Sequence, residues 1–315
     1  MTKYILRRIL LIIPLVFSIT TILFFVLKLI PGDPLAFLEQ QSTFSLTEEQ
    51  REAKMEALGL NDPLHEQYIR YMRGLILHGD MGRSVRTNNP VTYEILTRLP
   101  DTIVLALSSL ALATALSLPL GVLAALQRGR WLDRLIMFMS LFFVSMPAFF
   151  FGLILLLIFA LELDLFPSLG QGRTFTAYVH SLILPAVTLS LILIGVTTRM
   201  VRSSMLEVLS RDYVRTAHAK GVPGAHVVFG HALPNAMIPV LTIYAGQLSG
   251  LLGGAVVIER IFSWPGIGEV LVSAIFNRDY LVVTGVTLTF SLLVISVYLL
   301  LDITYAFVDP RVRLE

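Results

Sequence analysis

The segment DYVRTAHAKG (residues 212–221), followed by LPN at residues 233–235, lies between two strongly apolar stretches of the chain. It is polar and basic, and the connection that contains it is too long for a tight turn and too polar for lipid. We predict a short helix over Tyr213–Lys220 with Asp212 as its N-cap. Gly221 would end it, because glycine adopts the left-handed conformation without a Cβ penalty. A second short helix is expected over Ala225–Ala232.

Small residues in this segment would let another protein approach the backbone closely. They are Ala217, Ala219 and Gly221. Two short helices at a membrane surface with such residues are typical of a docking element. An ordinary loop between two membrane helices is the alternative.

The composition of the chain indicates an integral membrane protein. Of 315 residues 55% are hydrophobic and 15% are charged, and the mean hydropathy is +0.76. In a soluble domain, about a quarter of all residues are charged. The absence of cysteine excludes disulfides, thiolate metal sites and cysteine nucleophiles.

Six apolar stretches are long enough, or nearly so, to cross a hydrocarbon layer of about 30 Å as helices. Within them only Lys28 is charged, and it lies near an end where it can reach the interface. We expect no buried ionisable residue in the spans, so an ion or proton relay is not expected either. The energy source for transport would then lie on another chain. The fold class is therefore an all-α membrane protein with these six spans: Ile9–Ile30, Thr102–Leu126, Leu135–Leu161, Ser181–Thr198, Ala236–Ile258 and Leu281–Leu301.

Positive charge in the short loops predicts the orientation of these spans. Thirteen lysines and arginines fall on the side that holds both termini and residues 213–221, and three on the other, when residues 31–100 are left out as too long a loop. The side with thirteen is expected to be cytoplasmic. These are Lys3, Arg7, Arg8, Arg128, Arg130, Arg134, Arg199, Arg202, Arg211, Arg215, Lys220, Arg311 and Arg313, against Arg173, Arg260 and Arg278.

The chain then divides into four parts. Residues 1–30 form the tail and the first span, which we interpret as an uncleaved anchor. Residues 31–100 form an external subdomain, in which a helix over Leu64–Leu77 would pack one face on the outer ends of the spans; a contact with substrate or a receptor is the alternative. Residues 101–305 form the membrane core with the loop 199–235, and residues 306–315 a cytoplasmic tail. The packing face of the external helix comprises Tyr68, Met72, Leu75 and Ile76.

Prolines and glycines within the spans are candidates for gating or structural roles. Pro147 and Pro185 interrupt the third and fourth spans, and proline frees backbone carbonyls and kinks a membrane helix. The fifth span carries Gly246, Gly250 and Gly254 at intervals of four, a surface on which another helix can approach closely. That helix could belong to this chain or to a partner subunit.

The segment Trp264-Pro265-Gly266 follows the fifth span on the external side. A tryptophan before a tight Pro-Gly turn predicts a re-entrant or interfacial element with its indole at the level of the lipid headgroups.

Catalytic and metal-binding motifs are missing from the sequence. It contains no G-x-x-x-x-G-K-[ST] loop for nucleotide phosphates, no G-x-S-x-G and no H-E-x-x-H. Its six histidines are scattered, so we expect neither a catalytic nor a metal site.

The loop resembles the coupling motif E-A-A-x3-G-x9-I-x-L-P of ABC importer membrane subunits. Arg215-Thr216-Ala217 matches its start, Gly221 follows at the right distance, and Leu233-Pro234 closes it. Arg215 replaces the family's Glu and His231 its Ile, and the Arg-Thr-Ala form is similar to the dipeptide, oligopeptide and nickel permeases. Further matches, in order, are Pro31-Gly32-Asp33-Pro34, Leu58-Gly59-Leu60, Gly79-Asp80-x-Gly82-x-Ser84, Ile183-Leu184-Pro185, Arg202-Ser203-Ser204, Trp264-Pro265-Gly266 and Asp309-Pro310-Arg311.

The resemblance implies a type I importer permease in the bacterial inner membrane. It would form half of a pore with a second, homologous permease subunit, two ATPase subunits would bind the cytoplasmic loops, and an external solute-binding protein would deliver substrate. ATP and Mg²⁺ would be bound by the ATPases, and this chain would bind no cofactor and no nucleic acid. The residues assigned to ATPase coupling are Asp212, Tyr213, Arg215, Thr216, Ala217, Ala219, Lys220, Gly221, Leu233 and Pro234.

Di- or oligopeptides are the favoured substrates, with nickel, a metal chelate or glutathione as alternatives within the same architecture. Asn277-Arg278-Asp279-Tyr280 resembles some nickel permeases and also fits peptide permeases. A membrane scaffold or receptor without transport activity is the alternative from another class.

Overall fold

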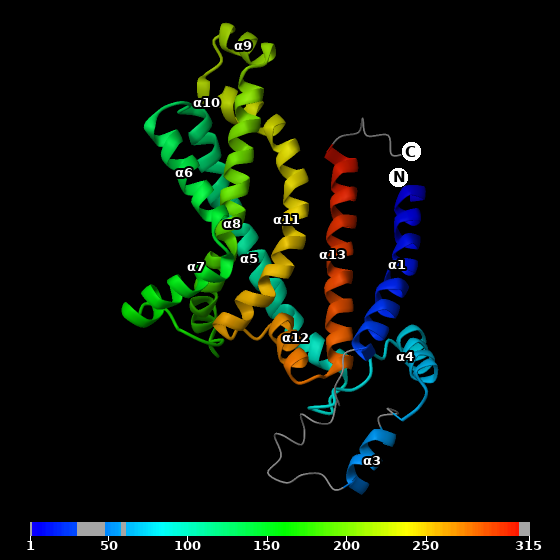
Figure 1. Ribbon diagram of the computed structural model, residues 1–315. Coiled ribbons are helices and arrows are strands. Elements are labelled where there is room, and N and C mark those ends of the chain that lie inside the picture. Colours follow the sequence, from blue (N-terminus) through cyan, green and yellow to red (C-terminus); the bar gives the residue numbers. More distant parts are fainter. Residues whose placement is uncertain (1, 30–47, 58–60, 309–315) are drawn as a thin grey trace. The chain divides into compact units, whose positions relative to one another are not determined.

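A computed structural model describes residues 2–29, 48–57 and 61–308 of the chain (Figure 1). Three predicted features lie outside the described residues: the Pro31–Pro34 turn, Leu58-Gly59-Leu60 and Asp309-Pro310-Arg311. The described part is helical and contains no β-strand, only an isolated bridge between Arg83 and Pro90. This confirms the all-α class.

The chain forms two compact units, which are described separately below. Unit 1 comprises residues 1–101 and 265–295, and unit 2 residues 102–264 and 296–315. The long helices α5 and α13 each contribute to both. The helices are α1 Thr2–Leu29, α3 Glu48–Ala57, α4 Leu64–His78, α5 Val91–Leu126, α6 Trp131–Ser145, α7 Ala148–Leu155, η1 Leu156–Glu162, α8 Phe175–Leu209, α9 Asp212–Ala219, α10 Gly224–His226, η2 Val227–Ala232, α11 Leu233–Phe262, α12 Ile267–Phe276 and α13 Tyr280–Val308.

Five described helices are long and apolar enough to cross a membrane, and a sixth span arises if the bent pair of α6 and α7–η1 is counted as one. The predicted interruption of the span Leu135–Leu161 at Pro147 is confirmed, because the two halves of this pair bend by 102°. Pro147 stands at the break as the N-cap of α7, where it lacks the N–H that would continue the helix. The other five expected spans correspond to α1, α5, α8, α11 and α13.

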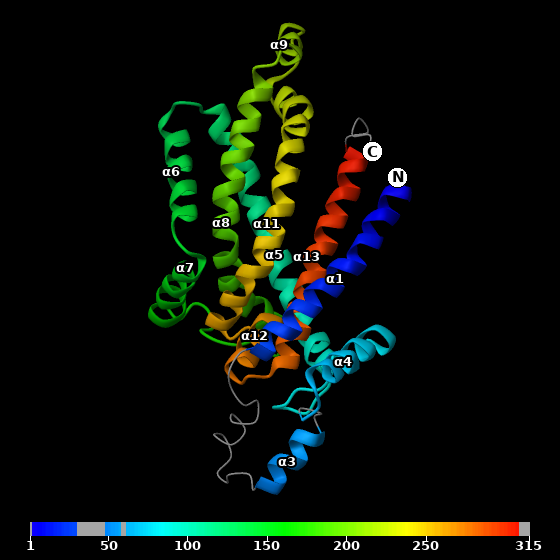
Figure 2. The same ribbon diagram turned by 45° about the vertical axis from the view of Figure 1, so that its right-hand side comes forward.

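In unit 2, α8 is the central helix and packs against α6, α7 and α11 (Figure 2). Glycine permits the closest of these contacts. A Cβ at Gly195 of α8 would lie 2.5 Å from the carbonyl oxygen of Ser140 in α6, and one at Gly121 of α5 would lie 2.6 Å from Cβ of Val201 in α8. Both distances are shorter than a side chain allows. Pro185 is buried within α8.

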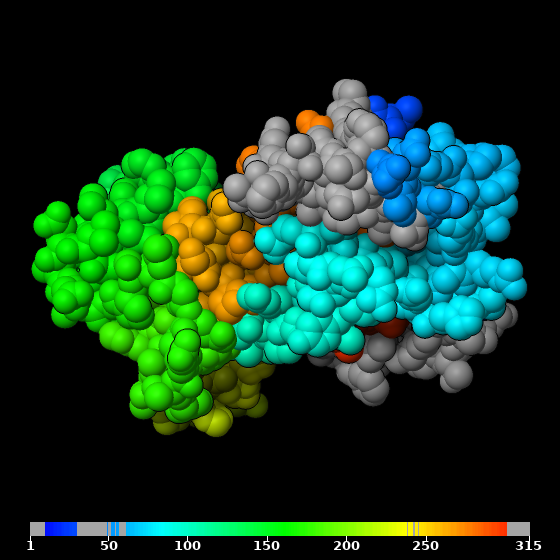
Figure 3. Space-filling view, turned by 90° about the horizontal axis from the view of Figure 1, so that it is seen from below, coloured from blue at the N-terminus to red at the C-terminus, as the bar shows by residue number. Residues whose placement is uncertain are grey.

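In unit 1, the first turns of α5 pack on α12 and α13 around Val91, Ile95, Ile267 and Val286, all of which are buried. Figure 3 draws residues 61–100 in blue to cyan, and on the face shown the segment between α4 and α5 adjoins the rest of this range. The α5 helix already begins at Val91, within the stretch that the sequence assigned to the external subdomain.

The external helix forms as α4 and packs on α1, as expected for three residues of its predicted face. Tyr68, Met72 and Leu75 belong to one apolar cluster with Phe24 of α1. Ile76 was wrongly assigned to this face, because 67% of its surface is exposed. Tyr71 takes its place, and burial raises the pKa of the Tyr71 hydroxyl to about 12.

Candidate functional site

The predicted docking helix exists as α9, Asp212–Ala219, and lies beyond one end of α8 (Figure 1). Its N-cap is Arg211, whose side chain makes no capping hydrogen bond. The sequence predicted Asp212 as the N-cap, but Asp212 is the first helical residue. An acidic residue in the first turn is still favourable, because it faces the positive end of the helix dipole. Its carboxylate lies 3.7 Å from Arg215, with both side chains largely exposed.

Gly221 ends this element as predicted. Its φ is +75°, in the left-handed region, and no atom lies within 4 Å of the position that a Cβ would take. The amide of Val222 donates to the carbonyl of Ala217 at 3.2 Å, and the amide of Gly221 to that of His218 at 3.0 Å. These bonds satisfy carbonyls at the helix end and direct the chain back toward the membrane.

One residue of α9 anchors it to the rest of unit 2. Val214 is 2% exposed, and α9 contacts η2 and α8. Ala217 lies on the Val214 side and is half-buried, so it belongs to the inner flank of the helix. The opposite face consists of exposed residues, among them two short side chains, Thr216 and Ala219. This outward face comprises Asp212, Arg215, Thr216 and Ala219, with Tyr213 and Lys220 exposed beside it.

The second short helix is not a separate element. The chain runs from α10 through one π-helical segment, η2, directly into α11 at Leu233. Val227 and Ala232 are fully buried in η2, whereas Leu233 is half-buried and Pro234 is exposed in the first turn of α11. No loop therefore separates η2 from the membrane helix α11.

An ion pair that the sequence did not reveal joins α6 to α8 in the same unit. Arg202 donates from Nε to Oδ1 of Asp133 at 2.6 Å and from Nη2 to Oδ2 at 2.8 Å. The amide of Gly129 donates to Oδ2 at 2.9 Å. Asp133 is 3% exposed. The sequence indicates Arg202 as a positive charge and as part of the Arg202-Ser203-Ser204 match, but not its partner, which lies 69 residues away.

The glycine series of α11 divides into two parts. A Cβ at Gly254 would lie 3.2 Å from Leu189 of α8, so Gly254 packs within this chain. Nothing described lies within 4 Å of a Cβ at Gly246 or Gly250. Packing within the chain is thus confirmed for Gly254. Packing of Gly246 and Gly250 against a partner subunit stays a prediction.

Trp264 is not an interfacial anchor. Its side chain is fully buried, and its ring lies 5.2 Å from that of Tyr178. The reversal occurs two residues before the Pro-Gly pair, at Ser263, whose φ is +49°. That turn directs the indole into the apolar cluster of unit 2 instead of toward lipid headgroups. Gly266 has an extended backbone and is the N-cap of α12, and Pro265 precedes it.

The expectation that the spans hold no buried ionisable residue is also wrong. Glu259 lies within α11 and is fully buried, and the hydroxyl of Thr102 donates to its Oε1 at 2.6 Å. The predicted span stopped at Ile258, whereas the apolar helix continues to Phe262 and encloses the carboxylate. Extending the predicted span to Phe262 would have placed Glu259 within it.

In unit 1, two of the quoted motifs meet across 195 residues. Ser84 donates to Oδ2 of Asp279 at 2.6 Å, and the amide of Val282 lies 3.4 Å from Oδ1. Asp279 is 2% exposed, and burial raises the pKa of its carboxyl against the opposing effect of these hydrogen bonds. Asp279 and Ser84 also line a small cavity of about 60 Å³. Within the part of the chain that the structure describes, no group of three acidic or histidine side chains could hold a metal ion.

Two family models together match most of the chain. Residues 117–314 match the binding-protein-dependent transport system inner membrane component, and residues 1–106 match the N-terminal part of the same membrane component. The chain belongs to this family.

Relatives in this transport family are similar over the full length. The oligopeptide transport system permease protein AppB of Bacillus subtilis is 41% identical over 99% of this chain and 100% of its own. The di/tripeptide permease DppB of Pseudomonas aeruginosa is 42% identical, and the glutathione permease GsiC of Salmonella paratyphi A is 38% identical, each over 99% of both chains.

The fold of this chain is also similar to that of a chain in a solved transporter. A chain of the methionine ABC transporter MetNI, in an inward-facing conformation, superimposes with a TM-score of 0.59. The match covers 69% of this chain and 97% of the other at 18% sequence identity, so it concerns the fold alone.

Proposed function

We propose that this chain is the membrane-spanning permease subunit of an ABC importer and that α9 is its contact with an ATPase subunit. The observation that carries the proposal is the outward face of α9. It presents short side chains, Thr216 and Ala219, while Val214 holds the helix against η2 and α8. Such a face fits a groove, and the unbroken path from η2 into α11 fits the transmission of a rigid-body shift.

Partners follow from this role. Two ATPase subunits would bind ATP and Mg²⁺ and supply the hydrolysis that this chain has no phosphate-binding loop to perform. A second, homologous permease would complete the pore, and a solute-binding protein would deliver substrate from outside. The chain would thus not be an enzyme by itself, and α9 and both termini would face the cytoplasm of a bacterial inner-membrane protein.

Peptides are the proposed substrates. The relatives at 41% and 42% identity are named for oligopeptides and di/tripeptides. Glutathione, the substrate in the name of a relative at 38% identity, is itself a small peptide and is less favoured. Nickel import by the same architecture stays the further alternative.

The test enlarges the outward face of α9 without disturbing its buried side. Ala219→Arg places a long cation on an exposed position, so the chain should fold and insert normally. Close approach of a partner would be blocked, and an uncompensated charge would be forced into the contact. We expect loss of ATPase co-purification and of peptide uptake at matched membrane levels.

Two variants serve as controls. Ala219→Ser keeps the side chain small and should retain both activities. Arg215→Glu restores the acidic residue of the general motif and should be tolerated better than Ala219→Arg. If Ala219→Arg takes up peptide and retains its ATPase like the unaltered protein, α9 is only a connector and the proposed role is wrong.

A further inference from the structure

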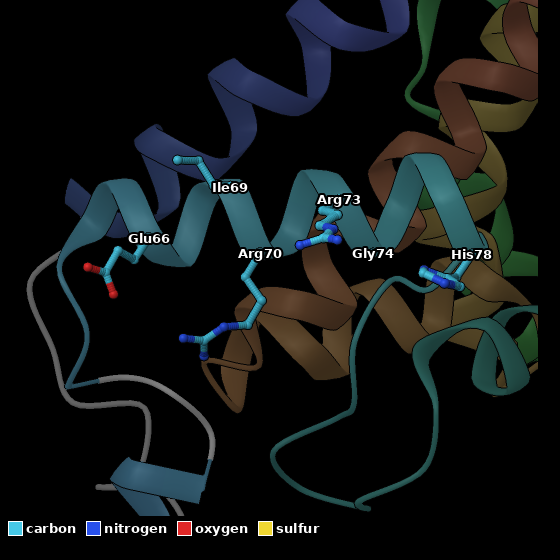
Figure 4. Close-up of a pocket in the computed structure, with 6 residues that line it drawn as sticks. All are labelled: Glu66, Ile69, Arg70, Arg73, Gly74 and His78. Atoms are coloured by element: carbon cyan, nitrogen blue, oxygen red, sulfur yellow. The ribbon is translucent and has the colours of Figure 1, made fainter.

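The helix α4 carries a feature that the transport function does not require: exposed apolar and cationic side chains on a helix packed against a membrane span. Leu64–His78 buries Tyr71 and Met72. Ile69, Ile76 and Leu77 are nevertheless 59%, 67% and 63% exposed. An open groove on its surface is lined by Glu66, Ile69, Arg70, Arg73, Gly74 and His78 (Figure 4).

The contacts with α1 define how deep this helix lies. The apolar part of α1 is Leu10–Leu29, and its 20 residues span about 30 Å, the thickness of the hydrocarbon layer. Tyr71 stacks on Phe24 at 5.9 Å, and Lys28 donates to Oε1 of Gln67 at 2.7 Å. Phe24 lies about 8 Å before the end of the span at the helical rise of 1.5 Å per residue. The α4 helix therefore packs on the last turns of the span and not beyond it.

That depth matches the position of a helix lying in the membrane interface, whose apolar face is buried about 5–10 Å into the headgroup and acyl boundary. The side chains are sorted accordingly. Figure 4 shows Glu66 and Arg70 directed away from α1, whereas Ile69 points to the side on which α1 lies. Ile76 follows Ile69 at a spacing of seven, on the same flank of the helix.

The cations of α4 differ in their partners. Arg70 forms an ion pair with Asp62. Among the side chains that the structure describes, no ion pair joins Arg73 to an acidic residue. Arg73 therefore retains a guanidinium that can donate in a bidentate manner to a phosphate.

We propose that α4 is an interfacial helix and that its Arg73 binds the phosphate of an anionic phospholipid at the end of α1 that contains Leu29. Ile69 and Ile76 lie against the acyl chains. A water-exposed α4 would leave these side chains hydrated at a level where the bilayer begins, and a protein partner would have to displace lipid from the flank of a span. Lipid is thus the occupant that the depth of α4 favours.

The first experiment measures what surrounds Ile69. The chain contains no cysteine, so Ile69→Cys and Glu66→Cys can each carry a single spin label in the assembled transporter in lipid nanodiscs. We expect the label at position 69 to collide preferentially with oxygen, which concentrates in lipid, and the label at position 66 with a water-soluble nickel chelate. Collision with the chelate at both positions, or with neither reagent at position 69, would overturn the proposal, the second outcome indicating a protein partner.

The second experiment tests the headgroup. Added phosphatidylglycerol should raise the melting temperature of the detergent-solubilised transporter more than phosphatidylcholine does, and inorganic phosphate should have no effect. Arg73→Gln should abolish the difference between the two lipids. Arg70→Gln, on the same helix but paired with Asp62, should keep it. Equal effects of both lipids on the unaltered protein, or an undiminished difference in Arg73→Gln, would refute a specific anionic site.

Discussion

At the scale of single residues, three buried carboxyl groups of this permease differ in the hydrogen-bond donors that they accept from. Asp133 has a guanidinium in bidentate geometry, Glu259 accepts from Thr102, and Asp279 accepts from a hydroxyl and backbone amides. Asp133, which is paired with a cation, and Asp279, which accepts from neutral donors, respond differently to substitution and to pH, because desolvation of Asp279 is not offset by an opposite charge.

Removal of Arg202 should be costly. Arg202→Ala leaves the buried Asp133 carboxylate without the guanidinium that donates to both of its oxygens, and we expect the free energy of unfolding to fall by about 3–5 kcal/mol. Asp133→Asn combined with Arg202→Ala removes the charge as well and should recover part of this loss. Unfolding of the purified chain in detergent measures both. Equal losses in the single and the double variant would show that the ion pair itself is not what matters.

The Asp279 carboxyl should make the stability of unit 1 depend on pH. Its folded pKa lies above the unfolded value of about 3.9, because burial disfavours the ionised form. Its contribution to stability is therefore greatest below the unfolded pKa and is lost as the pH rises through the folded pKa. We expect the amides of residues 84–90 to exchange faster at higher pH after correction for intrinsic rates.

Asp279→Asn is the control for that measurement. Asparagine keeps one acceptor oxygen and is an equally good residue at the start of α13, but it does not titrate in this range. The corrected exchange of residues 84–90 should then be independent of pH. The same pH dependence in Asp279→Asn and in the unaltered protein would assign the effect to another group.

At the scale of elements, glycine distinguishes contacts made within this chain from surfaces left open. Gly195→Ala would bring a Cβ to 2.5 Å from the carbonyl of Ser140 and should destabilise the packing of α6 on α8 by about 1–3 kcal/mol. Gly250→Ala meets nothing described within 4 Å and should leave the isolated chain unchanged or more stable by up to about 1 kcal/mol.

The two variants should separate again in the assembled transporter. If a second permease packs closely on α11, Gly250→Ala will weaken co-purification of that subunit although the isolated chain is intact. Thermal unfolding of the single chain and pull-down of the pair measure the two effects. Full assembly of Gly250→Ala would show that no close helix contact forms there.

At the scale of the whole molecule, the distribution of positive charge predicts the topology. A single cysteine in place of Asn61 should react with an impermeant thiol reagent in right-side-out spheroplasts. One in place of Ser210, next to α9, should react only after permeabilisation. Both side chains are exposed in the structure, so burial cannot mimic protection. Labelling in the opposite pattern would invert the orientation and place α9 outside the cell.

Composition and local pattern were enough to predict the apolar spans, the helix before Gly221 and its left-handed end, since each depends on neighbouring residues only. Tertiary structure decided the features that depend on distant ones. Trp264 is buried because a turn at Ser263 brings it to Tyr178, and Glu259 is buried because its helix continues to Phe262 beside Thr102. The Asp133–Arg202 pair requires α6 to reach α8, and a sequence pattern cannot specify which distant side chains will share one low-dielectric site.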